Sequence, residues 1–192
     1  MINLNKFIEL FISLQIIIIS TFVPIYITLP FTNGMIQTLE MPITWQIPSI
    51  IIITMIFKGK IVIKAFSIYL IIGLFFIPVF HQGGSLGYLL TPNFGYLLGL
   101  YPLIKIFDNL IKIKQKIIFY DLLKYGISGI LSMHLIGITY SCFQILYFKQ
   151  ADTLLYYISK YSLGNIGYHI LIITPITLLI KFINNKKYQR NV

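Results

Sequence analysis

Charged side chains are scarce in this sequence. They make up 10% of its 192 residues, whereas 57% are hydrophobic and the mean hydropathy is +0.85. An average soluble domain has about 25% charged residues, and so few charges cannot cover the surface of a water-soluble globule of this size. The composition excludes a soluble enzyme and a disordered chain, and it predicts an integral membrane protein.

Motifs of catalysis and metal binding are also missing. Cys142 is the single cysteine, which excludes a disulfide framework and a cysteine-built metal site. The sequence has no Gly-x-x-x-x-Gly-Lys-[Ser/Thr] phosphate loop and no His-Glu-x-x-His motif. Its five carboxylates are scattered and give no acidic pair within a hydrophobic segment. We therefore expect no catalytic residue, no metal site, no cofactor and no enzymatic activity.

Long hydrophobic segments recur along the chain instead. A membrane span needs about 20 mostly apolar residues, and short segments need tilt or burial by neighbouring helices. The candidate spans are residues 7–29, 43–57, 61–80, 94–107, 125–148 and 163–183. We expect an all-α integral membrane protein with six transmembrane helices in a single domain over residues 1–192, and an amphipathic stretch at 108–124.

Basic residues are distributed unevenly between the loops. With six spans both termini lie on one side, and that side holds all of the 15 Lys and Arg residues except Lys149 and Lys160. The positive-inside rule then places both termini in the cytosol, or in the stroma of a plastid. Topology and contact with anionic lipid account for the net charge of +10, so nucleic acid is not an expected partner.

The outer loops carry the signals of a binding site. These loops are residues 30–42, 81–93 and 149–162, and the first two are rich in Gly, Pro, Asn and Gln. Irregular backbone is unfavourable beside lipid, so such loops must pack over protein or line a cavity. Neutral polar side chains beside aromatic ones suit a small, mostly apolar ligand with a few hydrogen-bonding groups.

Glycine and proline concentrate in residues 73–99. Pro78 ends or kinks the third span, and Gly95 and Gly99, four apart, leave a flat helix face for contact. Positive φ and close backbone approach are expected at the loop glycines, Gly83, Gly84 and Gly87. From the residues alone, an ordinary re-entrant turn between two helices remains an equal alternative.

The same stretch resembles the BioY family, the substrate-binding S-components of energy-coupling-factor (ECF) biotin transporters. The similar string is Pro-Val-Phe at 78–80, Gly-Gly at 83–84, Gly at 87 and Pro-x-x-Gly-Tyr-Leu-x-Gly at 92–99. Upstream, Met-Pro-Ile-Thr-Trp-Gln at 41–46 resembles the family's Val-Pro-Val-Thr-Leu-Gln at the start of its second helix.

The resemblance implies a six-helix fold with a ligand pocket near the outer helix ends and a first outer loop, residues 30–41, that acts as a lid. It implies import of biotin or a close analogue across a bacterial plasma membrane or a plastid membrane. It also implies a membrane coupling subunit and ATPase subunits as partners. The family's Ala-x-x-x-Ala docking face is absent from residues 7–29, so docking uses another face, the partner differs, or the subunit is solitary.

The last span departs from the family, which has Pro-Gly-Asp-x-x-Lys at its start. Here Asn165 takes the place of the Asp and Tyr168 that of the Lys, at i and i+3 on one helix face. An amide can still bond the ureido ring of biotin. Tyr168 offers no positive charge at neutral pH, so the partner of the biotin carboxylate stays open.

The expected substrate site combines both motifs with the last span. Amide side chains would meet the ureido edge: Gln46, Gln82, Asn93 and Asn165. Aromatic side chains would wall the ring body: Trp45, Phe80, Tyr88 and Tyr96. The remaining expected members are Thr44, His81, Gly83, Gly84 and Tyr168. Trp45 could instead be an interfacial belt residue, and His81 could lie at the rim.

Two histidines inside the spans, His134 and His169, need separate mention. Intramembrane ionisable groups are functional candidates. Two scattered histidines form no metal-ligand cluster, however, and a structural role is the expected one.

Two rival functions are a structural subunit of a membrane complex and a small membrane enzyme. The first does not explain the glycine-rich outer loop, and the second lacks two convergent ionisable groups.

Overall fold

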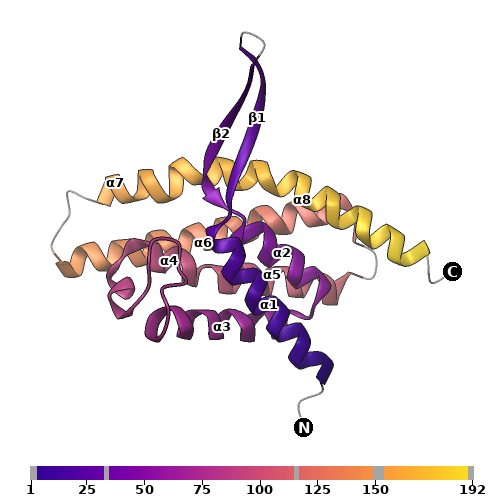
Figure 1. The fold of residues 1–192 in the computed structure, drawn as a ribbon, viewed down its shortest axis with the longest axis horizontal. Helices are drawn as coiled ribbons and strands as arrows, with labels where there is room; N and C mark the ends of the chain where they lie inside the picture. The colour runs from indigo at the N-terminus through magenta and orange to yellow at the C-terminus, as the bar shows by residue number, and fades with distance from the viewer. Residues whose placement is uncertain (1–3, 33–34, 115–116, 149–153, 190–192) are drawn as a thin grey trace.

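The described part of the chain is mainly helical and has one β-hairpin (Figure 1). A computed structural model describes residues 4–32, 35–114, 117–148 and 154–189. The helices are α1 (Leu4–Phe22), α2 (Gln46–Ile56), α3 (Gly59–Phe75), α4 (Pro92–Leu98), α5 (Leu100–Ile113), α6 (Phe119–Phe148), α7 (Leu154–Ile158) and α8 (Gly164–Gln189). Strands β1 (Pro24–Thr32) and β2 (Met35–Thr44) form the hairpin, and short 3-10 and π helices cover Leu86–Leu90 and Ser159–Leu163.

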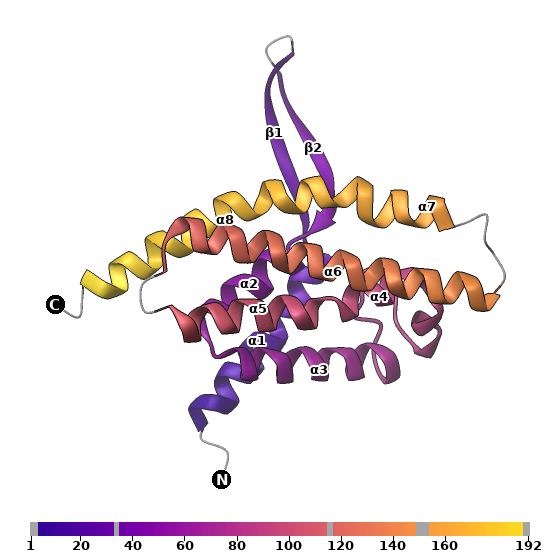
Figure 2. The ribbon, with the colours of Figure 1, turned by 180° about the vertical axis from the view of Figure 1, so that it is seen from behind.

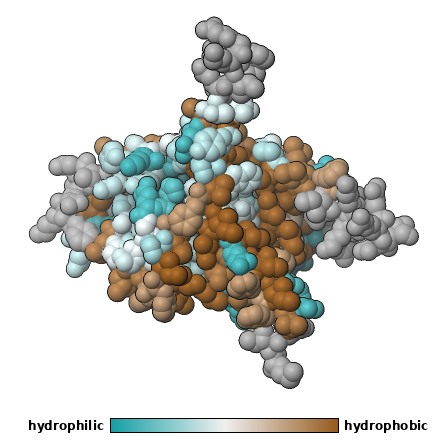
Figure 3. Space-filling view, viewed as in Figure 1, coloured by the Kyte–Doolittle hydropathy of each residue, from teal (hydrophilic) through white to brown (hydrophobic). Residues whose placement is uncertain are grey.

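Four helical segments of the described chain are long and apolar enough to cross a membrane. They are Leu4–Phe22, Pro92–Ile113, Phe119–Ile145 and Leu155–Phe182. Helix α2 is apolar but shorter, at 11 residues. Hydrophobic residues cover much of the face shown in Figure 3, whereas hydrophilic ones gather beside the base of the hairpin. The described chain is thus mainly helical and has helices apolar enough to span a membrane, as the composition predicts, but the β-hairpin departs from the all-α fold expected.

Four helices lie side by side in the order α8, α6, α5, α3, and α1 and α2 cross them (Figures 1 and 2). The hairpin crosses α8 and projects beyond it. The core between the helices is hydrophobic and mainly aliphatic, and its largest fully buried side chains are aromatic ones: Tyr69, Phe66, Phe80 and Phe107.

The expectation that one helix runs through residues 7–29 is wrong. Helix α1 ends at Phe22, because Pro24 has no N–H and cannot continue a helix. The β-branched and aromatic residues that follow favour a strand. Tyr26 pairs with Glu40, and Thr28 with Thr38, in an antiparallel ladder. Strands therefore replace both the end of the first expected span and the described part of the irregular loop expected at 30–42.

Other boundaries shift as well. Helix α3 ends at Phe75, before Pro78, instead of reaching residue 80. The stretch 108–124 is no separate amphipathic element, because its ends belong to α5 and α6. The outer segment expected at 149–162 is helical from Leu154 onward, and a π-helical turn joins it to α8. A π-turn inserts an extra residue per turn and is often found at functional sites.

The flat helix face expected at Gly95 and Gly99 is confirmed. A Cβ at Gly99 would lie 2.6 Å from the carbonyl oxygen of Met133, and a Cβ at Gly95 would lie 2.4 Å from the Cβ of Tyr140. On α6, Gly137 in turn leaves room for the ring of Tyr96. Glycine therefore sets how closely α4 and α5 approach α6.

Replacing Gly99 with alanine should destabilise the fold by about 1–3 kcal/mol, because the new methyl group meets backbone atoms that cannot move aside. Gly167→Ala is the matched control, since no atom lies within 4 Å of its Cβ position and alanine favours a helix by about 0.5–1 kcal/mol. Thermal unfolding in detergent measures both variants. Equal midpoints would contradict the role given to Gly99.

Candidate ligand-binding site

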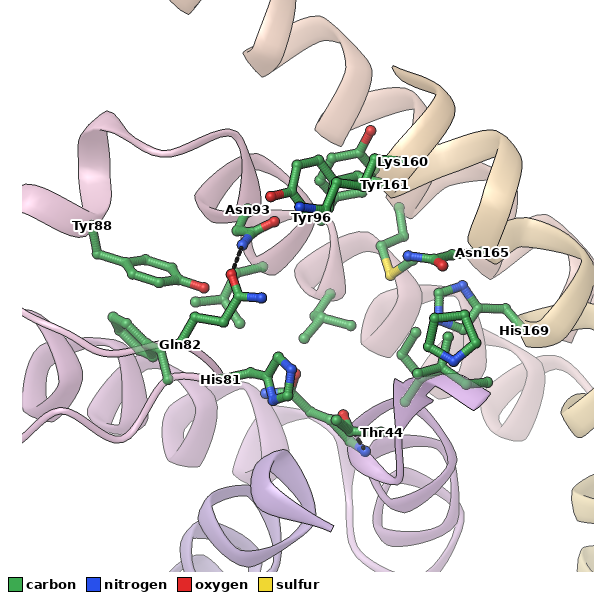
Figure 4. A pocket seen from close by; sticks show the side chains of 18 of the residues that line it. Thr44, His81, Gln82, Tyr88, Asn93, Tyr96, Lys160, Tyr161, Asn165 and His169 are labelled. Carbon is green, nitrogen blue, oxygen red and sulfur yellow. Dashed lines mark hydrogen bonds between the residues drawn. The ribbon is translucent and has the colours of Figure 1, made fainter. Parts of the chain in front are cut away.

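A cavity of about 370 Å³ lies where the hairpin base, the turn after α3, α4 and the start of α8 meet (Figure 4). Its volume is within the range of small-molecule sites. Its lining consists of Pro42, Ile43, Thr44, Gln46, Ile47, Tyr69, Phe80, His81, Gln82, Tyr88, Asn93, Tyr96, Leu97, Leu100, Met133, Lys160, Tyr161, Asn165 and His169. Elements distant in sequence, from Pro42 to His169, thus contribute to one site.

A tight turn after α3 brings His81 and Gln82 to the cavity. The backbone N–H of Phe80 donates to the carbonyl of Gly83 at 2.9 Å, and the N–H of Gly83 donates back at 3.1 Å. Gln82 has φ of 116°, which a side chain other than glycine rarely adopts. Its Oε1 accepts a hydrogen bond from Nδ2 of Asn93 at 2.9 Å. Strain of this kind is often retained at functional sites.

Glycines allow this turn to form by their backbone conformation and close packing, and they are not among the residues that line the cavity. Gly83 has the expected positive φ, at 128°. Gly84 is needed for a different reason, because its Cβ would lie 2.6 Å from the Cα of Pro78 and 2.7 Å from the carbonyl oxygen of Gly73. At Gly87 a Cβ would make only an ordinary contact of 3.5 Å. Positive φ is therefore found at one of the three loop glycines.

Gln46, at the start of α2, is held by the buried hydroxyl group of Tyr69. Its Nε2 donates to that oxygen at 3.2 Å. The same hydroxyl lies 3.2 Å from Oγ1 of Thr21 and donates to the carbonyl of Val79 at 3.4 Å. The arrangement joins α1, α2 and α3 at the cavity floor. It uses one amide N–H of Gln46 and leaves the amide oxygen for a ligand.

Aromatic rings form one wall. The ring of Phe80 lies 4.7 Å from that of Tyr88 and 5.3 Å from that of Tyr69. Gly73 makes space for Phe80, because a Cβ there would overlap its ring. Burial raises the pKa of the Tyr88 hydroxyl well above its ordinary value, and a hydrogen bond with Asn93 opposes the shift only in part. Tyr88 therefore stays neutral and can donate a hydrogen bond.

The opposite wall is a stripe along the π-turn and α8 that consists of Tyr161, Asn165 and His169 (Figure 4). Residues four apart share a helix face, so Asn165 is paired with His169 and not with Tyr168. Tyr168 instead packs against the hairpin cluster of Ile25, Met41, Ile43 and Ile172. Sequence reasoning missed His169, although its spacing from Asn165 was the available signal.

A lysine also lines the cavity, which the sequence interpretation did not foresee. Lys160 follows the start of the π-turn, and its Nζ lies 5.3 Å from the ring centroid of Tyr161 and 5.6 Å from that of Tyr156. Aromatic faces stabilise a nearby ammonium group. In the sequence, the available signal was that Lys160 is one of two basic residues expected on the outer side. The site thus holds a cation despite the Tyr at position 168.

Behind the cavity, four polar side chains form a continuous chain of hydrogen bonds. The hydroxyl of Tyr96 lies 2.6 Å from Oγ of Ser162, which lies 3.1 Å from Nδ1 of His134. Nε2 of His134 lies 3.1 Å from Nδ1 of His169. The two histidines expected to be scattered are therefore direct partners. No group of three or more potential metal-ligating side chains occurs in the described part of the chain.

Most of the expected site residues meet at the cavity. The lining includes Thr44, Gln46, Phe80, His81, Gln82, Tyr88, Asn93, Tyr96 and Asn165. Trp45, Gly83, Gly84 and Tyr168 lie outside it. Trp45 precedes α2 and its backbone N–H donates to the carbonyl of Val23 at 2.9 Å, which closes the base of the hairpin. Gly83, Gly84 and Trp45 support the turn and the hairpin base that line the cavity, whereas Tyr168 packs outside it.

Comparisons with known proteins identify the family and the fold of the chain. A model of the BioY family matches residues 3–183. The probable biotin transporter BioY of Lysinibacillus sphaericus is 40% identical over 58 residues, which span 30% of this chain and 30% of that protein. The S-component for biotin from an ECF-type ABC transporter has a similar crystal structure, with a TM-score of 0.63 and 20% identity over 96% of this chain and 95% of that one. The last similarity is one of fold.

Proposed function

The chain belongs to the BioY family, and on that basis we propose that it is the substrate-binding S-component of an ECF-type transporter and that it imports biotin or a close analogue. The family match confirms the resemblance seen in the sequence. The function remains one of binding and transport, not of chemistry on the ligand.

One observation carries the proposal: the cavity combines aromatic walls, neutral amide groups and a single lysine (Figure 4). Biotin has a largely apolar bicyclic body, a ureido group and a carboxylate. The side chains of Gln46, Gln82, Asn93 and Asn165 offer both donors and acceptors to the ureido group. Phe80, Tyr88 and Tyr96 cover the ring body. A purely structural subunit would have no need of such a cavity.

Lys160 supplies the charge complement of the carboxylate. It precedes His169 by nine residues, and the α-helical part from Gly164 to His169 alone spans about 7.5 Å at 1.5 Å per residue. An elongated acid can therefore reach Lys160 with its charged end while its ring body lies between Asn165 and the aromatic wall. This assignment replaces Tyr168, which faces the hairpin.

The topology follows the charge distribution. We propose that α1, α2, α3, α4 with α5, α6, and α7 with α8 are the six membrane crossings of one domain. Both termini then face the cytosol or stroma. The partners are a membrane coupling subunit and two ATPases, in a bacterial plasma membrane or a plastid membrane, with anionic lipid around the basic side. Docking uses a surface other than an Ala-x-x-x-Ala face.

Purified protein in lipid nanodiscs should bind radiolabelled biotin, and Gln46→Leu and Asn165→Leu should each weaken binding. An unpaired polar group on the ligand costs about 1–3 kcal/mol, or roughly 5- to 150-fold in affinity. Tyr168→Phe is the control, because that ring packs outside the cavity, and its affinity should be unchanged. Wild-type protein that binds no biotin would refute the proposed function.

Lys160→Met should weaken binding of biotin about fivefold or more, whereas binding of biotin amide should change less than twofold. The amide carries no charge, so only the acid loses an ion pair. Competition against radiolabelled biotin measures both ligands, and Lys181→Met, outside the cavity lining, is the matched control. Equal losses for acid and amide would mean that Lys160 does not bind the carboxylate.

A further inference from the structure

The chain of hydrogen bonds behind the cavity links two of its lining residues, Tyr96 and His169, through two residues that do not line it, Ser162 and His134. It also joins α4, the π-turn, α6 and α8. Ser162 and His134 are buried, at 2% and 3% exposure. In such a chain, the choice of donor at one lining residue decides whether the other lining residue donates or accepts.

The hydrogen atoms of this chain can be arranged in two ways, which differ in which member of each pair donates. In a neutral imidazole one nitrogen donates and the other accepts, so between Nε2 of His134 and Nδ1 of His169 a single nitrogen carries the hydrogen. That choice fixes the other nitrogen of each ring. In one direction His169 offers an Nε2–H donor to the cavity, and in the other it offers an Nε2 acceptor.

The Tyr96 end favours the first direction. A phenol is the stronger acid and the weaker acceptor. Donation from the hydroxyl of Tyr96 to Oγ of Ser162, at 2.6 Å, is therefore favoured over donation to Ser141, the weaker of its two hydroxyl partners. Ser162 has a single hydrogen, which it then donates to Nδ1 of His134. His134 in turn carries its hydrogen on Nε2 and donates it to Nδ1 of His169. Every acceptor along the chain is thereby used once.

Nε2 is the other polar atom of the His169 side chain. Among the described residues no buried side-chain nitrogen or oxygen lacks a hydrogen-bond partner, and the partner of His169 is bound at Nδ1. His169 itself is 8% exposed and lines the cavity. Its accessible polar atom is therefore Nε2.

We propose that this chain of hydrogen bonds from Tyr96 to His169, here called the relay, fixes His169 as an Nε2–H donor to a carbonyl oxygen of the ligand. Ser162 and His134 are then positioning residues for His169. The inference rests on the proposed function, in which the carbonyl is that of the ureido group. It makes His169 a specificity-determining residue. The guanidinium analogue 2-iminobiotin has an N–H donor in place of the carbonyl. This donor would face the Nε2–H donor of His169, so no hydrogen bond could form.

The direct test is nuclear magnetic resonance of protein labelled with 15N in the histidine rings, with and without biotin. The chain has three histidines, and His81→Gln assigns the third. Ring 15N shifts distinguish the two neutral tautomers. With biotin bound, His134 and His169 should both carry their hydrogen on Nε2. A proton on Nδ1 of His169 in the complex would overturn the relay and leave the proposed function intact.

Ser162→Ala tests positioning without removing a cavity residue. It should lower biotin affinity about fivefold and give His134 a mixture of tautomers. Ser20→Ala is the matched control, since Ser20 is also buried but bonds the carbonyl of Ile17 in its own helix, and it should change neither readout. Unaltered affinity and tautomers in Ser162→Ala would refute the relay.

His169→Phe tests the ligand contact itself. Biotin affinity should fall roughly 5- to 150-fold, and the preference for biotin over 2-iminobiotin at neutral pH should shrink. A preference that stays at the wild-type value would exclude His169 from recognition of the carbonyl. Absence of biotin binding by the wild-type protein would refute the proposed function, whereas these outcomes in a protein that binds biotin refute only the relay.

Discussion

The close approach of α4 and α5 to the backbone of α6 is the constraint on which the binding site depends. Gly99 permits this close approach at Met133 of α6, and Gly137 of α6 leaves room for the ring of Tyr96 of α4. This approach brings the rings of Tyr96 and His134 to a centroid distance of 5.7 Å. A wider spacing would separate the donors and acceptors of the relay, because hydrogen bonds weaken steeply with distance and angle.

Polar groups within a membrane protein need internal partners, and this fold supplies them both within a local turn and between elements distant in sequence. The hydroxyl of Tyr69 holds Gln46, the turn at Phe80 and Gly83 bonds to itself, and Ser162 links Tyr96 to His134. Each arrangement satisfies its buried atoms and still directs one polar group to the cavity. A membrane environment without water in its core would make such pre-arranged groups effective in binding.

Much of the fold and part of the site could be predicted from the sequence. Composition gave the membrane class, and the Gly- and Pro-rich stretch at 73–99 located the turn that carries His81 and Gln82. The hairpin was missed because hydrophobicity alone cannot separate a strand from a span, although Pro24 and the Asn-Gly pair at 33–34 are hairpin signals. The partnership of His134 with His169 could not be foreseen, since it depends on how α6 packs against α8. Lys160 was assigned to a loop because a π-turn has no characteristic hydrophobic periodicity in the sequence.

The most direct test of this account is a structure of the purified protein determined with biotin bound. We expect ligand density in the cavity between the turn at Gln82 and the stripe of Tyr161, Asn165 and His169. The carboxylate should lie beside Nζ of Lys160 and the ureido carbonyl should point toward Nε2 of His169. Biotin bound elsewhere on the protein, with this cavity empty, would contradict it.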